Sequence, residues 1–184
     1  LKIYTILNMS FKYLCITPFF PSKDNCEGIF IYDQISEIKK QTNFDIIVIK
    51  LSNYYNKELS YTYNEFKVHI FNLYDFPSFT LAGIFSRSNG KRFYNFLNSI
   101  INMNLVKYVH GHVNYPAGFL ISYLKKHISF ISIIQHHGLD VFQEKHFGFL
   151  TKFYYKRYFL PKSIFFQNNT DLVVGVSNKV LDYL

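Results

Sequence analysis

Short apolar runs alternate with longer amphipathic segments along this chain. The run 44–51, FDIIVIKL, is almost wholly apolar, as expected for a strand buried on both faces of a parallel sheet. In the segment 28–41, Ile31, Ile35 and Ile38 recur at helical spacing and predict a stripe that faces the core. The alternation of the two patterns predicts parallel strands joined by crossover helices.

The same criteria place the remaining elements. The expected strands span residues 11–17, 44–51, 67–73, 106–110, 130–135 and 171–176. The expected helices span residues 28–41, 88–102, 115–126 and 144–160, with a last helix capped by Ser177. The polar residues 52–65 are predicted to form a loop. The sequence therefore predicts an α/β, Rossmann-like domain: a doubly wound, mostly parallel sheet of six or seven strands with helices on both faces.

Length and composition narrow the class of protein. A chain of 184 residues suits one ordinary domain, and the residues before Met9 are expected to be an upstream extension. A net charge of +8 predicts attraction to an anionic partner: nucleic acid, acidic lipid or a phosphate-bearing substrate. Two cysteines, Cys15 and Cys26, are too few for a disulfide scaffold, and no apolar stretch reaches membrane-spanning length. These features predict a cytoplasmic location.

Candidate chemistry gathers where strands are expected to end, because ligands of such sheets bind outside the carboxyl ends of the strands. The loop 18–28 ends in Gly28 at a helix start. A glycine there lets an anion approach backbone N–H groups at the positive end of the helix dipole. Without a full G-x-G-x-x-G motif, an ordinary turn glycine is the alternative interpretation.

Histidines follow the fourth and fifth strands. We expect alternation to send His110 and His112 to opposite faces, with His112 in the crevice and His110 packed; a purely structural pair is the alternative. His136, His137 and Asp140 follow the next strand and could complete a metal site with His-x-His. Because no cysteine pair or helical H-E-x-x-H supports one, no metal is predicted.

The segment 152–159 interleaves basic and aromatic residues. This pattern is shared by nucleic-acid-binding surfaces, by helices at a lipid interface and by solvated helices with one buried aromatic face. No RRM, KH or helix-turn-helix signature supports nucleic acid, so none is predicted. We expect Lys152, Lys156, Arg157 and Lys162 to favour anionic membrane surfaces.

Three segments together resemble the N-terminal domain of GT-B glycosyltransferases of family 4. They are TPFFPSKDNCEGIFIYDQISEIKK, YVHGHVNYPAGFLISYLKKHISFISIIQHHGLDVF and DLVVGVSNKVLDYL, in the order that the family shows. Many members carry Gly-Gly where this chain has Glu27-Gly28. The resemblance implies that His112 faces the reacting sugar and is catalytic, and that Gly28 lies near the donor phosphates. It also implies a binding role for His137, Gly138 and Asp140 along the cleft wall. Ser177 is a candidate binding residue on other grounds, because helix caps at strand ends often line the crevice in this fold, and a cap alone is the alternative.

The resemblance implies a function for residues 9–184 as the acceptor-side half of a retaining glycosyltransferase. Such an enzyme moves a sugar from a nucleotide-sugar donor to a glycan or lipid-linked acceptor without a cofactor or metal. The family's C-terminal donor-binding domain is absent from this sequence, so the chain is expected to be inactive alone. Peripheral contact with the inner face of an anionic membrane would fit the basic charge. Two alternatives remain open: a non-catalytic acceptor-binding module or subunit, and a histidine-based metal-dependent hydrolase.

Overall fold

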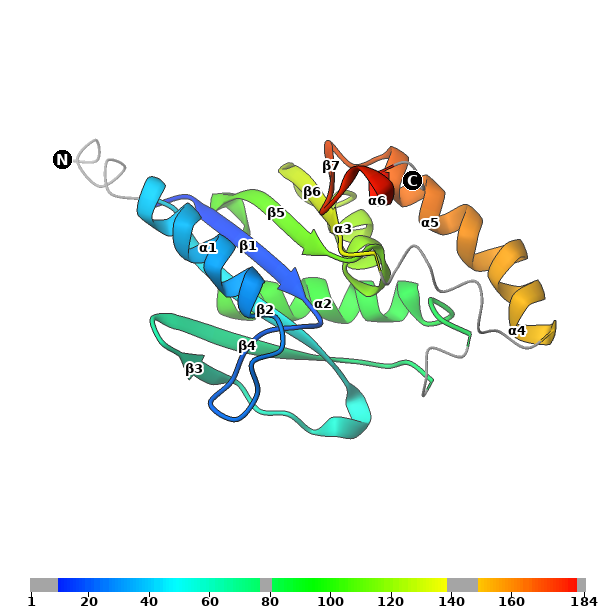
Figure 1. The fold of residues 1–184 in the computed structure, drawn as a ribbon, viewed down its shortest axis with the longest axis horizontal. Coiled ribbons are helices and arrows are strands. Elements are labelled where there is room, and N and C mark those ends of the chain that lie inside the picture. The colour runs from blue at the N-terminus through cyan, green and yellow to red at the C-terminus, as the bar shows by residue number, and fades with distance from the viewer. Residues whose placement is uncertain (1–9, 77–80, 139–148, 182–184) are drawn as a thin grey trace.

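A seven-stranded sheet runs through the described part of the protein (Figure 1). The computed structural model describes residues 10–76, 81–138 and 149–181. Within these ranges the strand order is β3-β4-β2-β1-β5-β6-β7, and every neighbouring pair is parallel except β3 with β4. The strands are β1 (Lys12–Thr17), β2 (Asp45–Asn53), β3 (Tyr61–Tyr63), β4 (Phe66–Leu73), β5 (Val106–His112), β6 (Ile131–His136) and β7 (Leu172–Gly175).

The helices occupy the crossovers between these strands. The α-helices are α1 (Ile29–Gln41), α2 (Ser86–Ile100), α3 (Phe119–Leu124), α4 (Phe149–Tyr154), α5 (Leu160–Asn168) and α6 (Asn178–Leu181). Four shorter segments are η1 (Tyr54–Asn56), η3 (Met103–Leu105), η4 (Asn114–Gly118) and η6 (Tyr155–Phe159), the last of which joins α4 to α5.

The topology confirms the Rossmann-like prediction. Without the antiparallel edge strand β3, the order β4-β2-β1-β5-β6-β7 is that of a doubly wound dinucleotide-binding sheet. The chain winds outward from β1 through β2 to β4, and then crosses back through α2 to β5 on the other side of β1. The direction of winding therefore reverses between β1 and β5, and folds of this kind place their ligand crevice at that point.

Several boundaries differ from the sequence prediction. The helix predicted for 144–160 continues as α5 to Asn168, and two further differences concern strands. The segment 52–65 was predicted to be a loop, but it contains η1 and β3. Three-residue β3 lies at the sheet edge with Thr62 exposed, so no buried apolar run marks it. Strand β5 runs to His112 rather than His110, because it lies between β1 and β6 and keeps pairing with β6 through His112.

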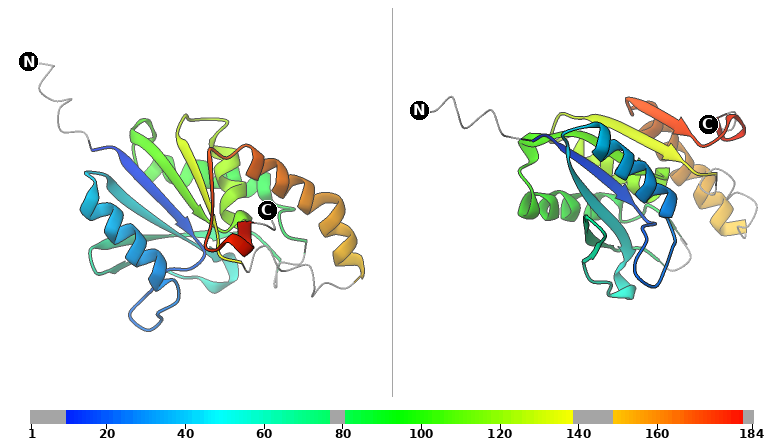
Figure 2. Two further views of the ribbon diagram at one scale, coloured as in Figure 1. Left: turned by 45° about the horizontal axis from the view of Figure 1, so that its top comes forward. Right: turned by 60° about the vertical axis from the view of Figure 1, so that its left-hand side comes forward.

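Helices cover both faces of the sheet (Figure 2). On one face, Ile31 and Ile35 of α1 pack against a cluster that includes Tyr13 and Cys15 of β1. On the other face, residues of α2 and α3 pack against the alternate residues of β1, Leu14 and Ile16. The helical stripe predicted in segment 28–41 therefore lies in the core, although Ile38 is only partly buried.

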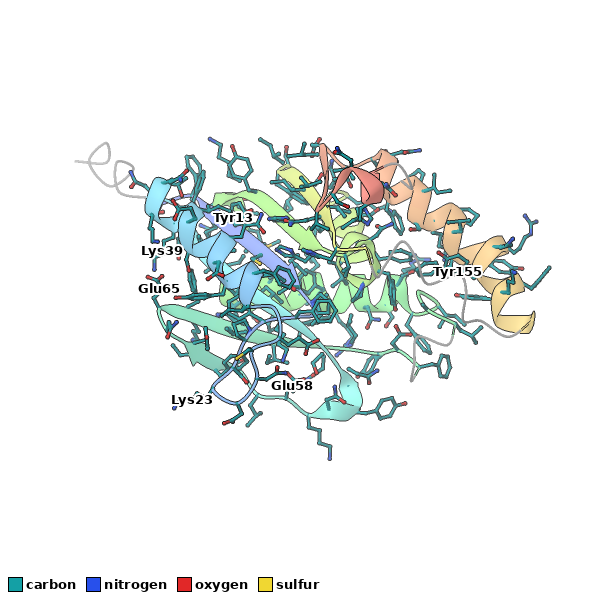
Figure 3. All side chains as sticks on the ribbon, in the orientation of Figure 1. Tyr13, Lys23, Lys39, Glu58, Glu65 and Tyr155 are labelled. Carbon is teal, nitrogen blue, oxygen red and sulfur yellow. The ribbon has the colours of Figure 1, made fainter. Side chains whose placement is uncertain are left out.

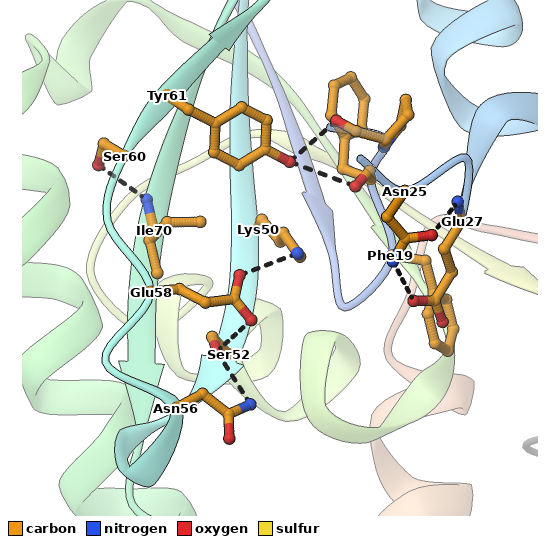
Figure 4. Close-up of polar contacts among 12 residues, drawn as sticks. Phe19, Asn25, Glu27, Lys50, Ser52, Asn56, Glu58, Ser60, Tyr61 and Ile70 are labelled. Carbon is orange, nitrogen blue, oxygen red and sulfur yellow. Dashed lines mark hydrogen bonds and ion pairs between the residues drawn. The ribbon is translucent and has the colours of Figure 1, made fainter. Parts of the chain in front are cut away.

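Side-chain contacts fix the connections on the β3–β4 side of the sheet. Figure 3 shows Lys39 of α1 beside Glu65 of the β3–β4 turn, and their charged groups are 3.1 Å apart. In Figure 4 the Tyr61 hydroxyl donates to the backbone carbonyls of Phe20 and Pro21, at 3.2 and 3.0 Å, and so ties the edge strand β3 to the loop 18–28. The loop that borders the predicted crevice is thereby held to the sheet.

Candidate functional site at the switch point

A hollow of about 640 Å³ opens beside the point where the winding reverses. Its wall combines the loop and amino end of α1 with residues that follow or end β6 and β7. The lining residues are Phe19, Glu27, Gly28, Phe30, Gln34, Gln135, His137 and Val176. This volume lies within the range of small-molecule and cofactor sites. Two of the predicted site residues, Gly28 and His137, therefore meet in one hollow although they are far apart in sequence.

Gly28 is required by local geometry. Its φ of 80° lies in the left-handed region, which side chains other than glycine rarely adopt. A Cβ at this position would lie 2.7 Å from the carbonyl group of Phe19 and 2.9 Å from the nitrogen of Phe20. The turn-glycine interpretation thus has direct support. A role for Gly28 in anion binding stays a prediction, consistent with the place of the amino end of α1 in the wall of the hollow.

His110 and His112 lie on the same face of β5, so the prediction of opposite faces was wrong. Residues two apart on a strand share a face, and the two imidazole rings lie 4.3 Å apart between centroids. The intervening Gly111 faces the other way, where a Cβ would lie 2.6 Å from Ile121 and 3.1 Å from Ala117. The glycine lets the segment that leads into α3 approach β5, while both histidines turn toward the face that α1 covers.

A hydrogen bond fixes the inner end of this histidine stack. The Tyr13 hydroxyl lies 2.7 Å from Nδ1 of His110. Burial, with a smaller contribution from Cys15, raises the pKa of Tyr13, so the phenol keeps its proton beside the imidazole. Tyr13 was not among the residues singled out from the sequence, because a tyrosine inside an apolar strand looks like ordinary core.

Burial keeps His110 uncharged. The pKa of His110 is lowered to about 4, mainly by burial; interaction with Gln135 opposes the shift, and the charge of His137 adds to it. The contact with Gln135 is weak, because neither Nε2 of His110 nor Oε1 of Gln135 makes a hydrogen bond of regular geometry within the described residues. The predicted packing of His110 is confirmed, since only 3 % of its surface is exposed.

His112 does not project into open solvent, which corrects the expectation that it faces the crevice. Its exposure is 0 %, and it does not line the hollow. Its Nδ1 lies 3.0 Å from Nε2 of His137, and the two rings are nearly parallel with centroids 5.2 Å apart. Burial, with repulsion from His110 and His137, holds the pKa of His112 well below its ordinary value. His112 therefore reaches the hollow only through His137.

His137 is the outer end of the stack. It is half-buried, lines the hollow, and lies 4.9 Å from the ring of Phe30 on α1. The arrangement runs from Tyr13 in the core, through His110 and His112, to an imidazole that a ligand in the hollow can reach. Such an imidazole can donate or accept a hydrogen bond.

The remaining predicted residues occupy different places. Gly138 is buried directly after His137, with φ of 92°. Ser177 caps α6 as predicted, because its Oγ accepts the N–H of Val180 at 3.3 Å; it does not line the hollow. Asp140 lies outside the described residues. His136 is buried on β6, on the face opposite Gln135, and is not brought to the hollow.

Backbone strain adjoins the histidine stack. Val113 has φ of 68°, an outlier for a β-branched residue that costs on the order of 1–3 kcal/mol. The Val113 N–H still donates to the carbonyl of Gln135, at 2.8 Å. The strained turn ends β5 directly after His112 and directs the chain into η4. No sequence pattern marks this residue, because valine is typical of strands.

The described residues hold neither a metal cluster nor a membrane span. Within residues 10–76, 81–138 and 149–181, no group of three or more His, Cys, Asp or Glu side chains is placed to hold a metal ion. No helix in the same ranges is long and apolar enough to cross a membrane.

Comparison with known proteins adds no family assignment, since no protein-family model and no curated protein sequence matches this chain.

Proposed function

We propose that this domain is the acceptor-side half of a retaining glycosyltransferase that uses a nucleotide-sugar donor. The observation that supports the proposal best is the meeting, in one hollow at the switch point, of the amino end of α1 with the outer imidazole of a buried histidine stack. The positive end of a helix dipole suits phosphate, and an imidazole suits a sugar hydroxyl. Both kinds of group are needed for a nucleotide sugar.

The residues have separate tasks in this proposal. The backbone at Gly28 and Phe30 faces the donor phosphates, while the Glu27 carboxylate at the rim accepts hydrogen bonds from sugar hydroxyls. His137 contacts the reacting sugar. His112 is a positioning residue: it stays neutral and holds the His137 ring through their 3.0 Å contact. Stabilising charge that develops at the transferring carbon requires such a pre-positioned dipole.

Transfer requires a second unit that grips the donor, because the hollow supplies one wall and catalysis depends on holding donor and acceptor together. We expect the 184-residue chain alone to bind nucleotide sugars with a Kd of about 1 mM or weaker, equivalent to about −4 kcal/mol, and to show no turnover. If the domain is instead a non-catalytic acceptor-binding module, turnover should also be absent. In that case, however, a nucleotide sugar should not bind at this hollow.

An NMR titration tests the proposal. The labelled chain is titrated with UDP-glucose, UDP-N-acetylglucosamine and GDP-mannose, with inorganic phosphate as a reference. At least one nucleotide sugar should shift the amide signals of Gly28 and Phe30 and the imidazole signals of His137, and His137→Ala should weaken that response. His127→Ala, at an exposed histidine that does not line the hollow, is the matched control. If all three donors leave these signals unchanged, the transferase proposal is wrong.

The helix that runs through α4, η6 and α5 suits a lipid surface. Phe153, Tyr158 and Phe165 are exposed on it, at 63, 54 and 56 %. Lys152, Lys156, Arg157 and Lys162 are exposed along the same stretch. Exposed rings between basic side chains are typical of helices at an anionic membrane interface. We therefore place a lipid-linked acceptor, presented at a membrane, among the substrates that fit the proposal.

A further inference from the structure

A second hollow, of about 350 Å³, lies where β2 and β4 end. Its wall is made almost entirely of aromatic rings with one carboxyl group: Tyr54, Tyr55, Tyr74, Asp75, Phe76 and Phe85. None of these residues lines the hollow at His137. Tyr54 and Tyr55 belong to η1 directly after β2, and Tyr74 to Phe76 directly follow β4. Both hollows therefore lie along the carboxyl edge of the same sheet.

From this wall of rings around a carboxyl group we infer a saccharide-binding site. The faces of a pyranose ring carry C–H groups, and the partly positive hydrogens of these groups are attracted to the negative face of an aromatic ring. The hydroxyls of the sugar need polar partners. The hollow supplies both. The site does not depend on the transferase proposal, because saccharide binding needs neither a nucleotide nor transfer. Where both hold, this hollow receives the acceptor glycan.

The aromatic rings are unusually open to solvent. Tyr54 is 51 % exposed, Tyr55 is 68 % exposed, and Tyr74, Phe76 and Phe85 are each close to 40 %. The Tyr54 and Tyr74 rings lie 4.9 Å apart and inclined by 60°, and the Phe76 and Phe85 rings lie 5.5 Å apart. Grouped exposed rings around a hollow mark a binding surface, whereas single exposed rings do not.

Asp75 supplies the polar partner. It is 8 % exposed and lines the hollow. Its Oδ1 accepts the N–H of Phe76 at 2.9 Å, and its Oδ2 accepts the hydroxyl of Tyr115. An ionised carboxylate has about four acceptor positions, so about two remain for the hydroxyls of a ligand.

The surrounding structure holds this site in place before any ligand arrives. Asn53 caps η1, because its side chain accepts the N–H of Tyr55 at 3.1 Å. Figure 4 shows Glu58 bound to Lys50 and Ser52, each at 2.9 Å, which closes the chain after η1 back onto β2. Asn89 of α2 bonds both the N–H and the carbonyl of Tyr74, at 3.0 and 2.7 Å. A pre-ordered site loses less conformational entropy on binding.

Charge favours a neutral saccharide over a quaternary ammonium ion, the other ligand that aromatic cages take. The Arg92 guanidinium already lies over the Tyr74 ring, 3.7 Å from its centroid, and would repel a second cation. The chain also carries a net charge of +8. A neutral polyol meets none of these penalties.

Saturation-transfer NMR on the 184-residue chain tests the inference. The probes are maltose, cellobiose, lactose, mannobiose and N,N′-diacetylchitobiose, with choline chloride as the cation probe. At least one disaccharide should bind, with saturation strongest on its ring C–H protons. Tyr54→Ala should weaken binding by about tenfold or more, because stacking contacts contribute on the order of a factor of ten. Tyr54→Phe keeps the ring and should bind as the unmodified chain does.

Two control variants separate binding in this hollow from binding elsewhere on the chain. Tyr158→Ala removes a tyrosine of similar exposure, 54 %, that does not line this hollow, and should leave disaccharide binding unchanged. His127→Ala, at an exposed histidine that lines neither hollow, should also leave it unchanged. The measurement uses no nucleotide, so failure of the transferase proposal does not disturb this test. Lack of binding by every disaccharide, binding that survives Tyr54→Ala, or binding of choline in place of sugar would each overturn the inference.

Discussion

Mild acid should destabilise this domain through His110 and His112. Both are buried, at 3 and 0 % exposure, and both have pKa values lowered mainly by burial, His110 to about 4 and His112 well below its ordinary value. In the unfolded chain each titrates near its ordinary pKa of about 6.5. Between pH 6.5 and about 4 the unfolded state therefore binds more protons than the folded state, and stability falls as the pH falls.

The magnitude follows from the same values. At pH 5.5, one unit below the ordinary pKa, protonation stabilises the unfolded state by about 1.4 kcal/mol for each histidine. The folded state gains almost nothing there, because its histidines stay neutral. The pair should thus cost about 3 kcal/mol between pH 7.5 and 5.5, a large part of the roughly 5–15 kcal/mol typical of a domain.

Urea unfolding monitored by circular dichroism, at pH 7.5 and 5.5, measures this loss. In His110→Asn the amide oxygen can still accept the Tyr13 hydroxyl, but the titration is gone, so the acid-induced loss should shrink by about 1.4 kcal/mol. His112→Asn should behave in the same way. Val109→Ala weakens the same strand at a buried residue without a titrating group and should keep the full loss. If both asparagine variants lose as much stability between pH 7.5 and 5.5 as the unmodified chain does, the two histidines are not held buried in their neutral form.

Two further predictions concern other parts of the fold. Gly28→Ala should cost at least about 1 kcal/mol in urea unfolding, because it combines a left-handed φ with a Cβ 2.7 Å from the backbone; an unchanged midpoint would contradict the loop geometry. Vesicles with acidic phospholipid should bind the chain more tightly than neutral vesicles. Neutralising the four basic residues of segment 152–162 should weaken the free energy of vesicle binding by about 1 kcal/mol for each residue. Vesicle binding that changes neither with acidic lipid content nor with these substitutions would refute the membrane assignment.

The regular part of the fold could be predicted because it follows from patterning. The almost wholly apolar run of β2 and the helical stripe of α1 each predict which faces are buried, and the structure contains both elements. The sequence-based prediction of elements failed mainly in polar segments. Strand β3 is too short and too exposed to leave an apolar pattern, and its pairing depends on β4, which only the assembled sheet supplies.

The candidate site was harder to predict than the fold. Strand order could place His112 and His137 at neighbouring strand ends, and the structure shows them 3.0 Å apart. The sequence could not show that β5 continues to His112 and buries it, because a histidine at the end of a strand can be either buried or exposed. The aromatic hollow was missed for a related reason: Tyr54 and Tyr74 belong to different loops, and only the parallel pairing of β2 with β4 brings those loops together.

The histidine stack contradicts several local rules at once, which is typical of functional rather than packing sites. Apolar residues would suit these buried positions, Nε2 of His112 has no hydrogen-bond partner among the described residues, and Val113 beside it is strained. If the stack exists for function, replacing it with apolar residues should cost no stability. The test is Tyr13→Phe with His110→Leu and His112→Leu, which removes the Tyr13–His110 hydrogen-bond partners together.

At pH 7.5 the triple variant should be as stable as the unmodified chain to within about 1 kcal/mol, or more stable, because volume-conserving apolar replacement of a buried polar group is often neutral or favourable. At pH 5.5 it should be more stable by about 3 kcal/mol, since the acid-sensitive pair is gone. Its response to nucleotide sugars at His137 should weaken, because that ring loses the contact that positions it. A triple variant that loses more than about 3 kcal/mol at pH 7.5 would show instead that the polar stack is a structural part of the core.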